Sequence, residues 1–394
     1  MEKYSLRFLS QEQVKQIGSK STPVFVYSRS EMDRLAKDVL AFKNPFGLTV
    51  RYAMKANPHP EVLKHYYKLG IGIDASSGPE AERALDAGVP GENIMLTTQQ
   101  LPDNLEELVS RGVLFNASSL HQLEQYGKAF KGGDISIRIN FGPLGKGGHK
   151  LVTTSGLDTS FGIWHEHLAE IKKLVDKYNL KVWQVHSHAA STASEDTWSN
   201  LTKAILKYLD NFEDVTSINI GGGFKIDRMH PEHNANLGRI SKDIYDLLSE
   251  HADKTGQKLK LEIEPGTYLS AEIGTIIAKI IDVKDTGVNG YNFIIINAGL
   301  TEIMRPALYG YNHPLIVVSE QEDSDEEYIV CGHACETADT LTVKPGDPDT
   351  FEPRLLTKAK IGDYLVIEGA GAYCATMSVT EYNLFPAAKE VFVA

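Results

Sequence analysis

Short apolar runs rich in β-branched residues recur along the first two-thirds of the chain, and small or polar residues follow each of them. Such runs are typical of strands that are buried on both faces of a parallel sheet. Eight runs are present, at residues 48–54, 70–76, 93–97, 113–117, 134–140, 181–187, 216–221 and 259–264. Helical patterns separate most of them, as at residues 79–88, 103–112 and 166–179. Gly88 and Gly112 close two of these patterns, as C-terminal helix caps commonly do.

Eight buried strands alternating with helices predict a (β/α)8 TIM-like barrel. The alternative is a doubly wound open sheet, which has about five to seven strands and a glycine-rich turn after the first one. No G-x-G-x-x-G motif follows the first run in this chain. The α/β barrel is therefore the preferred fold, and we expect it to occupy residues 28–268.

After residue 270 the pattern changes to apolar strands with turn signals and little helix between them. The strands include TIIAKIIDV, YNFIIINA, EYIVCG and DYLVIEG. The early run TPVFVY (22–27) has the same character. The chain is therefore predicted to carry a second, mainly β domain, a β-sandwich or barrel-like unit built from residues 1–27 and 269–394.

Charge and composition exclude several classes of partner. The net charge is −12, from 52 acidic and 40 basic residues, so no overall positive field is available for nucleic acid or for an anionic membrane. No stretch approaches the roughly 20 apolar residues of a membrane span. The N-terminus lacks the apolar core of a signal peptide, so a cytoplasmic location is expected.

The three cysteines are odd in number, and all lie in the last quarter of the chain. Cys331, Cys335 and Cys374 form neither a disulfide framework nor a zinc-binding spacing. No metal site is expected.

Chemically active side chains gather at the predicted strand ends, where barrel enzymes place their active sites. They are Lys55 after the first strand, Asp74–Ser76 after the second, His186, His188 and Ser191 after the sixth, Gly221, Gly222 and Gly223 after the seventh, and Glu264 after the eighth. Each alone has an ordinary interpretation as a solvated charge, a structural imidazole, a loop or a turn. Together they suggest a common ligand.

The combination fits pyridoxal 5′-phosphate. A glycine-rich loop after the seventh strand leaves backbone N–H groups open to a phosphate, and Ser191 adds a hydroxyl. His188 can lie flat against an aromatic ring. Glu264 can pair with a ring N–H⁺, and Lys55 can form an imine with the aldehyde.

Beyond these positions, whole segments of the chain match a known family. They are YAMKAN (52–57), HSHAAS (186–191), GGGF (221–224), LEIEPG (261–266), NAGLTEIMRPALYGYNHP (297–314), ACETAD (334–339) and GAGAYCATMSVTEYN (369–383). On these segments the chain resembles the fold-type III pyridoxal phosphate decarboxylases, whose barrels are alanine racemase-like. Within that group it is most similar to the diaminopimelate decarboxylase branch. The resemblance implies decarboxylation of meso-2,6-diaminopimelate to L-lysine in lysine biosynthesis.

The resemblance also implies roles for individual residues. Lys55 would hold the cofactor covalently, His188 would stack on its ring and Glu264 would pair with its nitrogen. The phosphate would be bound by Ser191, Gly221, Gly222, Gly223 and Tyr373, and the far end of the substrate by Arg305, Tyr309, Glu336 and Tyr373. Cys335 would protonate the α-carbon after CO2 leaves. In the family this cysteine and the following glutamate come from the neighbouring subunit, which implies a homodimer with shared sites.

The chain departs from the family pattern in its substrate region. Thr267 stands where the family has an arginine that contacts the substrate carboxylate, and Lys225 and Arg228 are candidate replacements for that cation. CETAD replaces CESGD, HAAS replaces HIGS and Asn297 replaces an aspartate. None of these changes affects Lys55 or Glu264.

Three alternatives therefore remain open. The protein could decarboxylate another amino acid, such as a carboxylated polyamine, ornithine, lysine or a D-amino acid. It could be a racemase, although a racemase needs a second base where this chain has the CETAD element. It could also be a non-catalytic homologue that binds the cofactor.

Overall fold

The computed structural model describes residues 4–144, 154–320 and 324–394. The described chain divides into two compact units. One comprises Asp33–Ile226 and His233–Leu269 and is called the barrel unit below. The other, the β unit, comprises the N-terminal residues up to Met32, Asp227–Glu232 and Ser270–Ala394. The short Asp227–Glu232 segment interrupts the sequence of the barrel unit, although no composition change marks it.

Eight parallel strands close into the predicted barrel. They are β2 (Leu48–Ala53), β3 (Gly72–Ala75), β4 (Ile94–Leu96), β5 (Leu114–Ala117), β6 (Asp134–Asn140), β8 (Lys181–His186), β9 (Ser217–Asn219) and β10 (Lys260–Ile263). Pairing of β10 with β2 and of β5 with β6 completes the ring. A short strand, β7 (Ile163–Trp164), adds to β6 outside this ring. The predicted (β/α)8 fold is confirmed.

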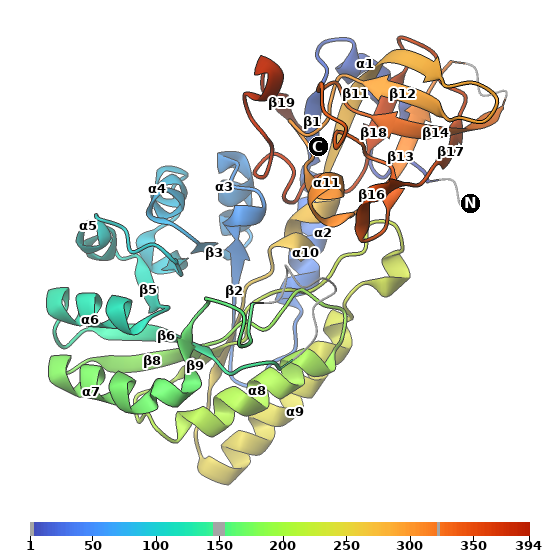
Figure 1. Ribbon diagram of the computed structural model, residues 1–394. Helices are drawn as coiled ribbons and strands as arrows, with labels where there is room; N and C mark the ends of the chain where they lie inside the picture. Colours follow the sequence, from blue (N-terminus) through green and yellow to red (C-terminus); the bar gives the residue numbers. More distant parts are fainter. Residues whose placement is uncertain (1–3, 145–153, 321–323) are drawn as a thin grey trace. The chain divides into compact units, whose positions relative to one another are not determined.

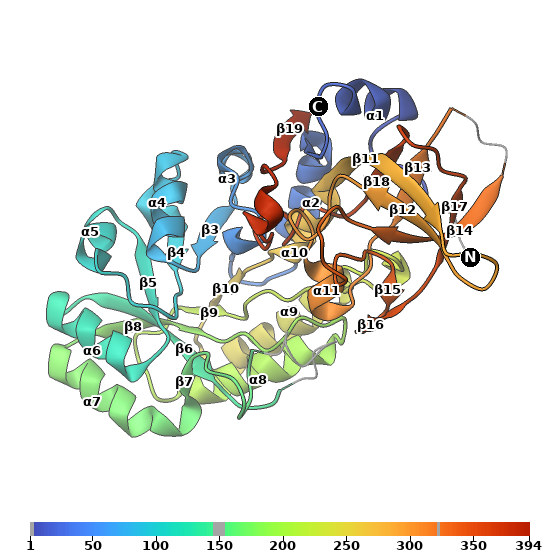
Figure 2. The same ribbon diagram turned by 45° about the horizontal axis from the view of Figure 1, so that its top comes forward.

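Helices follow the barrel strands in sequence and lie outside them (Figure 1; Figure 2). They are α3 (Pro60–Lys68), α4 (Gly78–Asp86), α5 (Leu105–Ser110), α6 (Leu120–Ala129), α7 (Leu168–Tyr178), α8 (Asp196–Leu209), α9 (Leu237–Thr255) and α10 (Thr267–Ser270), while α2 (Arg29–Leu40) precedes β2 along the chain. Serine caps start α4 and α6, since Ser77 and Ser119 accept the N–H of the third helical residue. Gly88 and Gly112 adopt positive φ just beyond α4 and α5, as predicted.

The β unit is built on one sheet whose strands follow the order β13-β18-β11-β12-β14-β17, with β1 and β19 added beside β11. Its strands are β1 (Val24–Ser28), β11 (Gly274–Asp285), β12 (Asn292–Ile296), β13 (Leu315–Val318), β14 (Asp325–Cys331), β17 (Arg354–Thr357), β18 (Tyr364–Ile367) and β19 (Lys389–Val393), with a hairpin of β15 (Val343–Lys344) and β16 (Asp347–Phe351). The unit also carries the helices α1 (Gln11–Gly18) and α11 (Arg305–Tyr309). Val14 of α1 packs into an aliphatic cluster with Val24 and Ile277, which secures this helix on the sheet.

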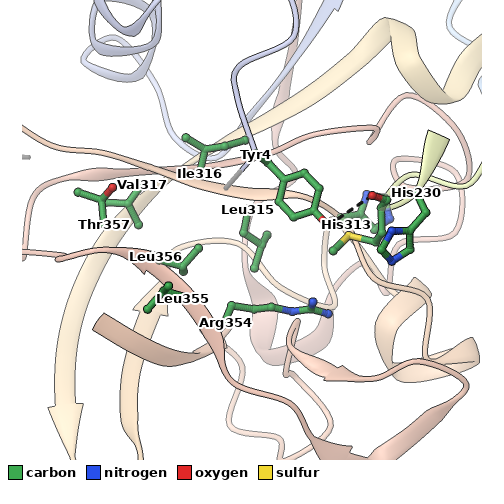
Figure 3. A pocket seen from close by; sticks show the side chains of 11 residues that line it. Tyr4, His230, His313, Leu315, Ile316, Val317, Arg354, Leu355, Leu356 and Thr357 are labelled. Carbon is green, nitrogen blue, oxygen red and sulfur yellow. Dashed lines mark hydrogen bonds between the residues drawn. The ribbon is translucent and has the colours of Figure 1, made fainter. Parts of the chain in front are cut away.

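A cavity of about 350 Å³ lies within the β unit, lined in part by β13 and β17, the two ends of the strand order (Figure 3). Its wall includes the aliphatic side chains of Leu315, Val317 and Leu356. Tyr4, His230, His313 and Arg354 add polar groups to the lining, and the Tyr4 hydroxyl donates to the carbonyl of Met229. None of the helices in the described part of the chain has both the length and the apolar character needed to cross a bilayer.

Candidate active site

Lys55 lies directly beyond β2 in a single 3₁₀ turn, Met54–Ala56. Met54 and Ala56 are buried, whereas the side chain of Lys55 is exposed. The N–H of Ala53, at the end of β2, donates to the carbonyl of Pro265 just after β10. This contact joins the carboxyl ends of two neighbouring barrel strands, so Lys55 emerges at the end of the barrel where the sequence predicts it.

Glu264 follows β10 and is 7% exposed. Asn219 at the end of β9 donates from Nδ2 to Oε1 of Glu264 at 2.6 Å and to Oε1 of Glu262 at 3.0 Å. Burial raises the pKa of Glu264, although the Asn219 hydrogen bond and the charges of Arg138 and Lys55 act in the opposite direction. A buried carboxylate in this state favours a cationic partner.

Asp74 is a second buried carboxylate at these strand ends, at the end of β3. Burial raises its pKa well above the usual range, and the nearby charge of Glu264 raises it further. Its Oδ1 is buried and accepts no hydrogen bond from the described residues. Two neighbouring buried carboxylates, one with an unsatisfied oxygen, fit a site that receives a positively charged or hydrogen-bond-donating ligand.

His188 lies in the loop after β8 and contacts the glycine loop that follows β9. Its Nδ1 accepts the N–H of Gly222 at 3.2 Å, so the ring proton of the neutral form lies on Nε2. Burial lowers the pKa of His188 well below its usual value, and the charges of Arg138 and Lys55 lower it further. A neutral imidazole can lie against an aromatic ring without a charge penalty.

The glycine loop is tightly packed, and only glycine fits at its centre. A Cβ at Gly222 would collide with the carbonyl oxygen of Glu264, and a Cβ at Gly223 would collide with that of Ala190. The N–H of Gly221 donates to Oδ1 of Asn219 at 2.8 Å. The N–H groups of Gly221 and Gly222 are therefore both used within the barrel unit, and these two bonds do not involve the N–H of Gly223.

Ser191 is partly exposed and lies beside the glycine loop because the two loops are joined by backbone bonds. The N–H of Thr192 donates to the carbonyl of Gly223 at 3.0 Å, and the N–H of Lys225 donates to the carbonyl of Thr192 at 3.1 Å. The structure thus brings a serine hydroxyl and the glycine loop to the same end of the barrel.

Arg305 and Tyr309 are the first and last residues of α11 in the β unit. Arg305 is 7% exposed, and its Nε has no hydrogen-bond partner among the described residues. Its guanidinium carbon lies 5.2 Å from the ring centroid of Tyr311, and the Tyr309 ring centroid lies 5.3 Å from that of Tyr311. An arginine on an aromatic surface with one donor unsatisfied suits an anionic group such as a carboxylate.

Tyr373 lies in the loop that follows β18 and has a φ of 56°. Arg228 holds this loop, since its Nε donates to the carbonyl of Gly369 at 2.7 Å and its Nη2 to that of Ala372 at 3.3 Å. Burial lowers the pKa of Arg228 to about 9, and the charge of Arg305 contributes to the shift. Arg228 therefore fixes the backbone around Tyr373.

Cys335 and Glu336 lie in an exposed turn of the β unit. Of the other cysteines, Cys374 is buried and Cys331 is partly buried at the end of β14. The N–H of Ala338 and the hydroxyl of Tyr382 lower the pKa of Glu336. The exposure of Cys335 distinguishes it from an ordinary core thiol.

A family model described as "Pyridoxal-dependent decarboxylase, pyridoxal binding domain" matches residues 32–271. The chain belongs to the pyridoxal-dependent decarboxylases.

Its relatives in this decarboxylase family match over nearly the whole chain. The diaminopimelate decarboxylase of Streptomyces coelicolor is 33% identical, and the match covers 94% of this chain and 84% of that protein. The enzyme of the same name from Escherichia coli K12 is 30% identical, with 94% and 88% covered. A crystal structure of a diaminopimelate decarboxylase superposes with a TM-score of 0.88 at 28% identity, and covers 98% of this chain and 91% of that one.

The barrel unit of this decarboxylase fits the family cofactor on its own geometry. The exposed amine of Lys55 lies among buried acids and imidazoles, and its charge influences Asp74, Glu264 and His188. The unsatisfied Oδ1 of Asp74 provides an acceptor. In the glycine loop, the bonds of Gly221 and Gly222 described above do not use the N–H of Gly223. The arrangement can hold an aldehyde, a protonated ring nitrogen and a phosphate on one molecule.

Arg138 and Asn219 are the contributors that the sequence analysis missed. Arg138 lies in β6 and acts electrostatically on both Asp74 and Glu264, while Asn219 bonds to Glu264. Both alternate with isoleucines, Arg138 in DISIRIN and Asn219 in SINI. Long polar side chains at alternate positions of a barrel strand are the signal that could have found them. The cavity of Figure 3 contains none of the predicted site residues.

Asp74→Asn should change how the stability of the cofactor-free decarboxylase depends on pH. The folded pKa of Asp74 is raised, so the folded protein holds a proton that the unfolded chain releases above about pH 4. The free energy of unfolding therefore falls as the pH rises from about 4 towards the raised folded pKa of Asp74. The fall is at most about 1.4 kcal/mol per pH unit.

Thermal unfolding between about pH 5 and about pH 8 should show a smaller decline for Asp74→Asn than for the wild type. The matched control is Asp86→Asn at the exposed end of α4, which should follow the wild type. Parallel curves for Asp74→Asn and the wild type would show that Asp74 is ionised in the folded protein without cost.

Proposed function

We propose that this protein uses pyridoxal 5′-phosphate to decarboxylate meso-2,6-diaminopimelate and releases L-lysine and CO2. The observation that carries the proposal is the association of Lys55, His188 and Glu264 at the strand ends of a barrel. The near-full-length similarity to enzymes named diaminopimelate decarboxylase supports this substrate. The activity places the protein in lysine biosynthesis.

In the barrel unit, Lys55 is proposed to attach the cofactor, and its amine later accepts and returns protons at the substrate nitrogen. When bound, the cofactor supplies a ring that accepts the electrons left behind by CO2. Glu264 holds a proton on the ring nitrogen, and burial strengthens that pairing. His188 supports the ring face. Ser191 and the glycine loop bind the phosphate.

In the β unit, Arg305 and Tyr309 are proposed to bind the distal carboxylate of the substrate. Glu336 accepts its distal ammonium, and a lowered pKa keeps this carboxylate ionised at neutral pH. Tyr373 contributes its hydroxyl to the phosphate and to the substrate. Cys335 delivers a proton from Sγ to the carbon that has lost CO2. Apart from this proton transfer, the roles of these residues are positional and electrostatic.

We further propose that the working unit is a homodimer in which Cys335 and Glu336 complete the site of the partner subunit. Their turn is exposed in the single chain, and the neighbouring Leu384 is 84% exposed. An apolar side chain and a reactive thiol exposed together suit a surface that another copy covers. A biosynthetic enzyme for a small charged amino acid belongs in the cytoplasm, where we place it.

The decisive test is an assay of purified protein with added cofactor. CO2 release is measured with meso-diaminopimelate, L-lysine, L-ornithine, carboxynorspermidine and D-amino acids. The proposal expects CO2 and L-lysine from meso-diaminopimelate, with much lower rates for the rest. A clear preference for a substrate without a second carboxylate would replace the substrate assignment and keep the cofactor chemistry.

Such a preference is the main alternative because Thr267 cannot replace the bidentate bonds of an arginine. A charged hydrogen bond contributes about 1.5–3 kcal/mol, so an uncompensated loss would weaken carboxylate binding by about 10- to 150-fold. Arg228 is buried, and it lies close enough to Arg305 for the charge of Arg305 to lower its pKa. Two of its donors serve backbone carbonyls, so any cationic help it gives comes from its charge and its remaining donors.

Thr267→Arg is expected to keep meso-diaminopimelate as the preferred substrate and to change its KM by less than about 10-fold. The reason is that Arg305 and Tyr309 remain to bind the distal carboxylate. The measurement is the KM for meso-diaminopimelate and for L-lysine, compared between the variant and the wild type. A buried threonine such as Thr301 cannot serve as a control, because an arginine would not fit there. Thr376→Arg, at an exposed position, is the matched control. Activity on meso-diaminopimelate that emerges only in Thr267→Arg would support the alternative.

A further inference from the structure

The segment Glu381–Phe385, called the support segment below, has an unusual backbone. Glu381, Asn383 and Leu384 have φ values of 67°, 50° and 58°. Non-glycine residues seldom adopt this left-handed region, and asparagine tolerates it better than glutamate or leucine. Such a conformation persists only where surrounding contacts hold it, and it is common next to functional groups.

Two neighbouring residues of the support segment bind the two neighbouring residues proposed for catalysis and substrate binding. Oδ1 of Asn383 accepts the backbone N–H of Cys335 at 2.8 Å. The hydroxyl of Tyr382 donates to Oε2 of Glu336 at 3.1 Å. The left-handed conformation of Asn383 accompanies this arrangement, in which consecutive side chains contact consecutive residues of the turn.

Contacts on both sides of these bonds anchor the support segment. The Phe385 ring stacks on the His333 ring with centroids 3.7 Å apart and an interplanar angle of 7°. Nε2 of His333 in turn forms a hydrogen bond of 2.7 Å with Oγ1 of Thr301. The N–H of Val379, shortly before the segment, donates to the carbonyl of Leu300 at 3.0 Å. The segment therefore has a fixed base from which to hold the turn.

The turn itself has a second support in Asp339. One carboxylate oxygen accepts the N–H of Leu300 at 2.7 Å, and the other accepts the N–H of Ala334 at 2.8 Å. A Cβ at Gly299 or at Gly332 would collide with this carboxylate, so glycine is required at both positions. Asp339 fixes the residue before Cys335, while the support segment fixes Cys335 and Glu336 themselves.

We propose that Asn383 and Tyr382 are positioning residues, Asn383 for the proton-donating thiol of Cys335 and Tyr382 for the carboxylate of Glu336. The inference rests on the proposed function, since it assumes that these two groups act on the substrate. A proton donor works only within hydrogen-bond reach of its target atom. A shift of about 1 Å in such a group can lower the rate by roughly 10²-fold.

The two residues should act on different kinetic constants. Loss of the Asn383 contact displaces the proton donor, so kcat should fall while KM changes little. Loss of the Tyr382 hydroxyl removes one of the hydrogen bonds that lower the pKa of Glu336, the other major one being from Ala338. The carboxylate then protonates at a higher pH, so KM of Tyr382→Phe should rise most at the acidic end of the pH profile.

Asn383→Gly and Asn383→Asp separate the hydrogen bond from the backbone conformation. Glycine tolerates the left-handed φ but removes the acceptor, whereas aspartate keeps an acceptor oxygen in nearly the same place. Asn179→Gly is the matched control, because Asn179 also has a left-handed φ of 52° but caps α7 in the barrel unit. Each variant is assayed as the holoenzyme, in water and in D2O.

The readout in D2O is the configuration of deuterium at the product carbon that lost CO2. The wild type and Asn179→Gly should give a single stereoisomer. Asn383→Gly should lower kcat by about 10-fold and give a stereoisomer mixture, because solvent then competes with the displaced thiol. Asn383→Asp should restore most of the stereospecificity. A slower Asn383→Gly enzyme that stays fully stereospecific would overturn the proposal, as would an unchanged one.

A substrate-free measurement separates failure of this inference from failure of the proposed function. Iodoacetamide alkylation of Cys335, located by peptide mapping, should be several-fold faster in Asn383→Gly than in the wild type because the turn is freed. Cys331 serves as the internal control. If the wild type releases no CO2 from meso-diaminopimelate, the proposed function fails, and the alkylation rates still show whether Asn383 positions the thiol. Equal alkylation rates contradict the positioning role.

Discussion

Lys55→Ala should purify without covalently attached cofactor and should lose at least roughly 10²–10⁴-fold of the turnover. The reason is the position of Lys55 at the end of β2, where its charge acts on Asp74, Glu264 and His188. None of the other strand-end residues named above carries an amine. Reduction of the wild type with borohydride, followed by peptide mapping, should place the pyridoxyl group on Lys55.

The matched control is Lys64→Ala, which changes an exposed lysine in the following helix α3. It should retain the visible absorption of bound cofactor and normal turnover. A pyridoxyl label on any other lysine, or a Lys55→Ala protein with unchanged absorption and activity, would contradict the assignment of the cofactor site. The pyridoxyl label is located in the wild type, and turnover is measured in the variant. The two results therefore test the role of Lys55 independently.

The barrel could be predicted from the sequence because its strands are buried on both faces. These strands appear as short runs rich in β-branched apolar residues, and a residue of different character follows each run. Lys55 after β2 and Glu264 after β10 stand out for this reason. Parallel strands place those ends on one side of the barrel, so positions far apart along the chain can be assigned to one site from the strand pattern alone.

The contacts that tune the site could not be predicted in the same way. Arg138 and Asn219 lie within strands. Asn219 bonds to Glu264, and Arg138 acts on it through its charge, only after the barrel has closed. Arg228 gives a second example, since its bonds to Gly369 and Ala372 span more than 140 residues of sequence. Neither periodicity nor local turn signals carry information about such pairs.

The support segment gives a third example of a feature that the sequence hides. EYNLF reads as an ordinary loop, and apart from Asn383 nothing in it signals three left-handed residues. Its significance follows from which groups it meets, namely the backbone of Cys335 and the carboxylate of Glu336. The resemblance to the decarboxylases identified the cysteine, but only the structure identifies what holds it.

Cys335→Ala is the second change with a large expected effect. The variant should bind the cofactor normally, because Cys335 is not among the residues proposed to hold it and Lys55, His188 and Glu264 belong to the barrel unit. Turnover to L-lysine should fall by roughly 10²–10⁴-fold. A thiol suits this task because it is protonated at neutral pH and still donates readily. The support segment holds the backbone of the donor, since Oδ1 of Asn383 accepts the N–H of Cys335.

Cys331→Ala is the matched control for that variant, since Cys331 ends β14 and its Sγ lies 3.6 Å from Oγ1 of Thr340. It should keep near-normal turnover. Cys335→Ser retains a proton donor of higher pKa, so its rate should lie between those of the alanine variant and the wild type. The measurements are the visible absorption of bound cofactor and the rates of CO2 and L-lysine formation. Turnover of Cys335→Ala within a few-fold of the wild type would make Cys335 a packing residue, and the donor would then have to lie on another group that reaches the same carbon.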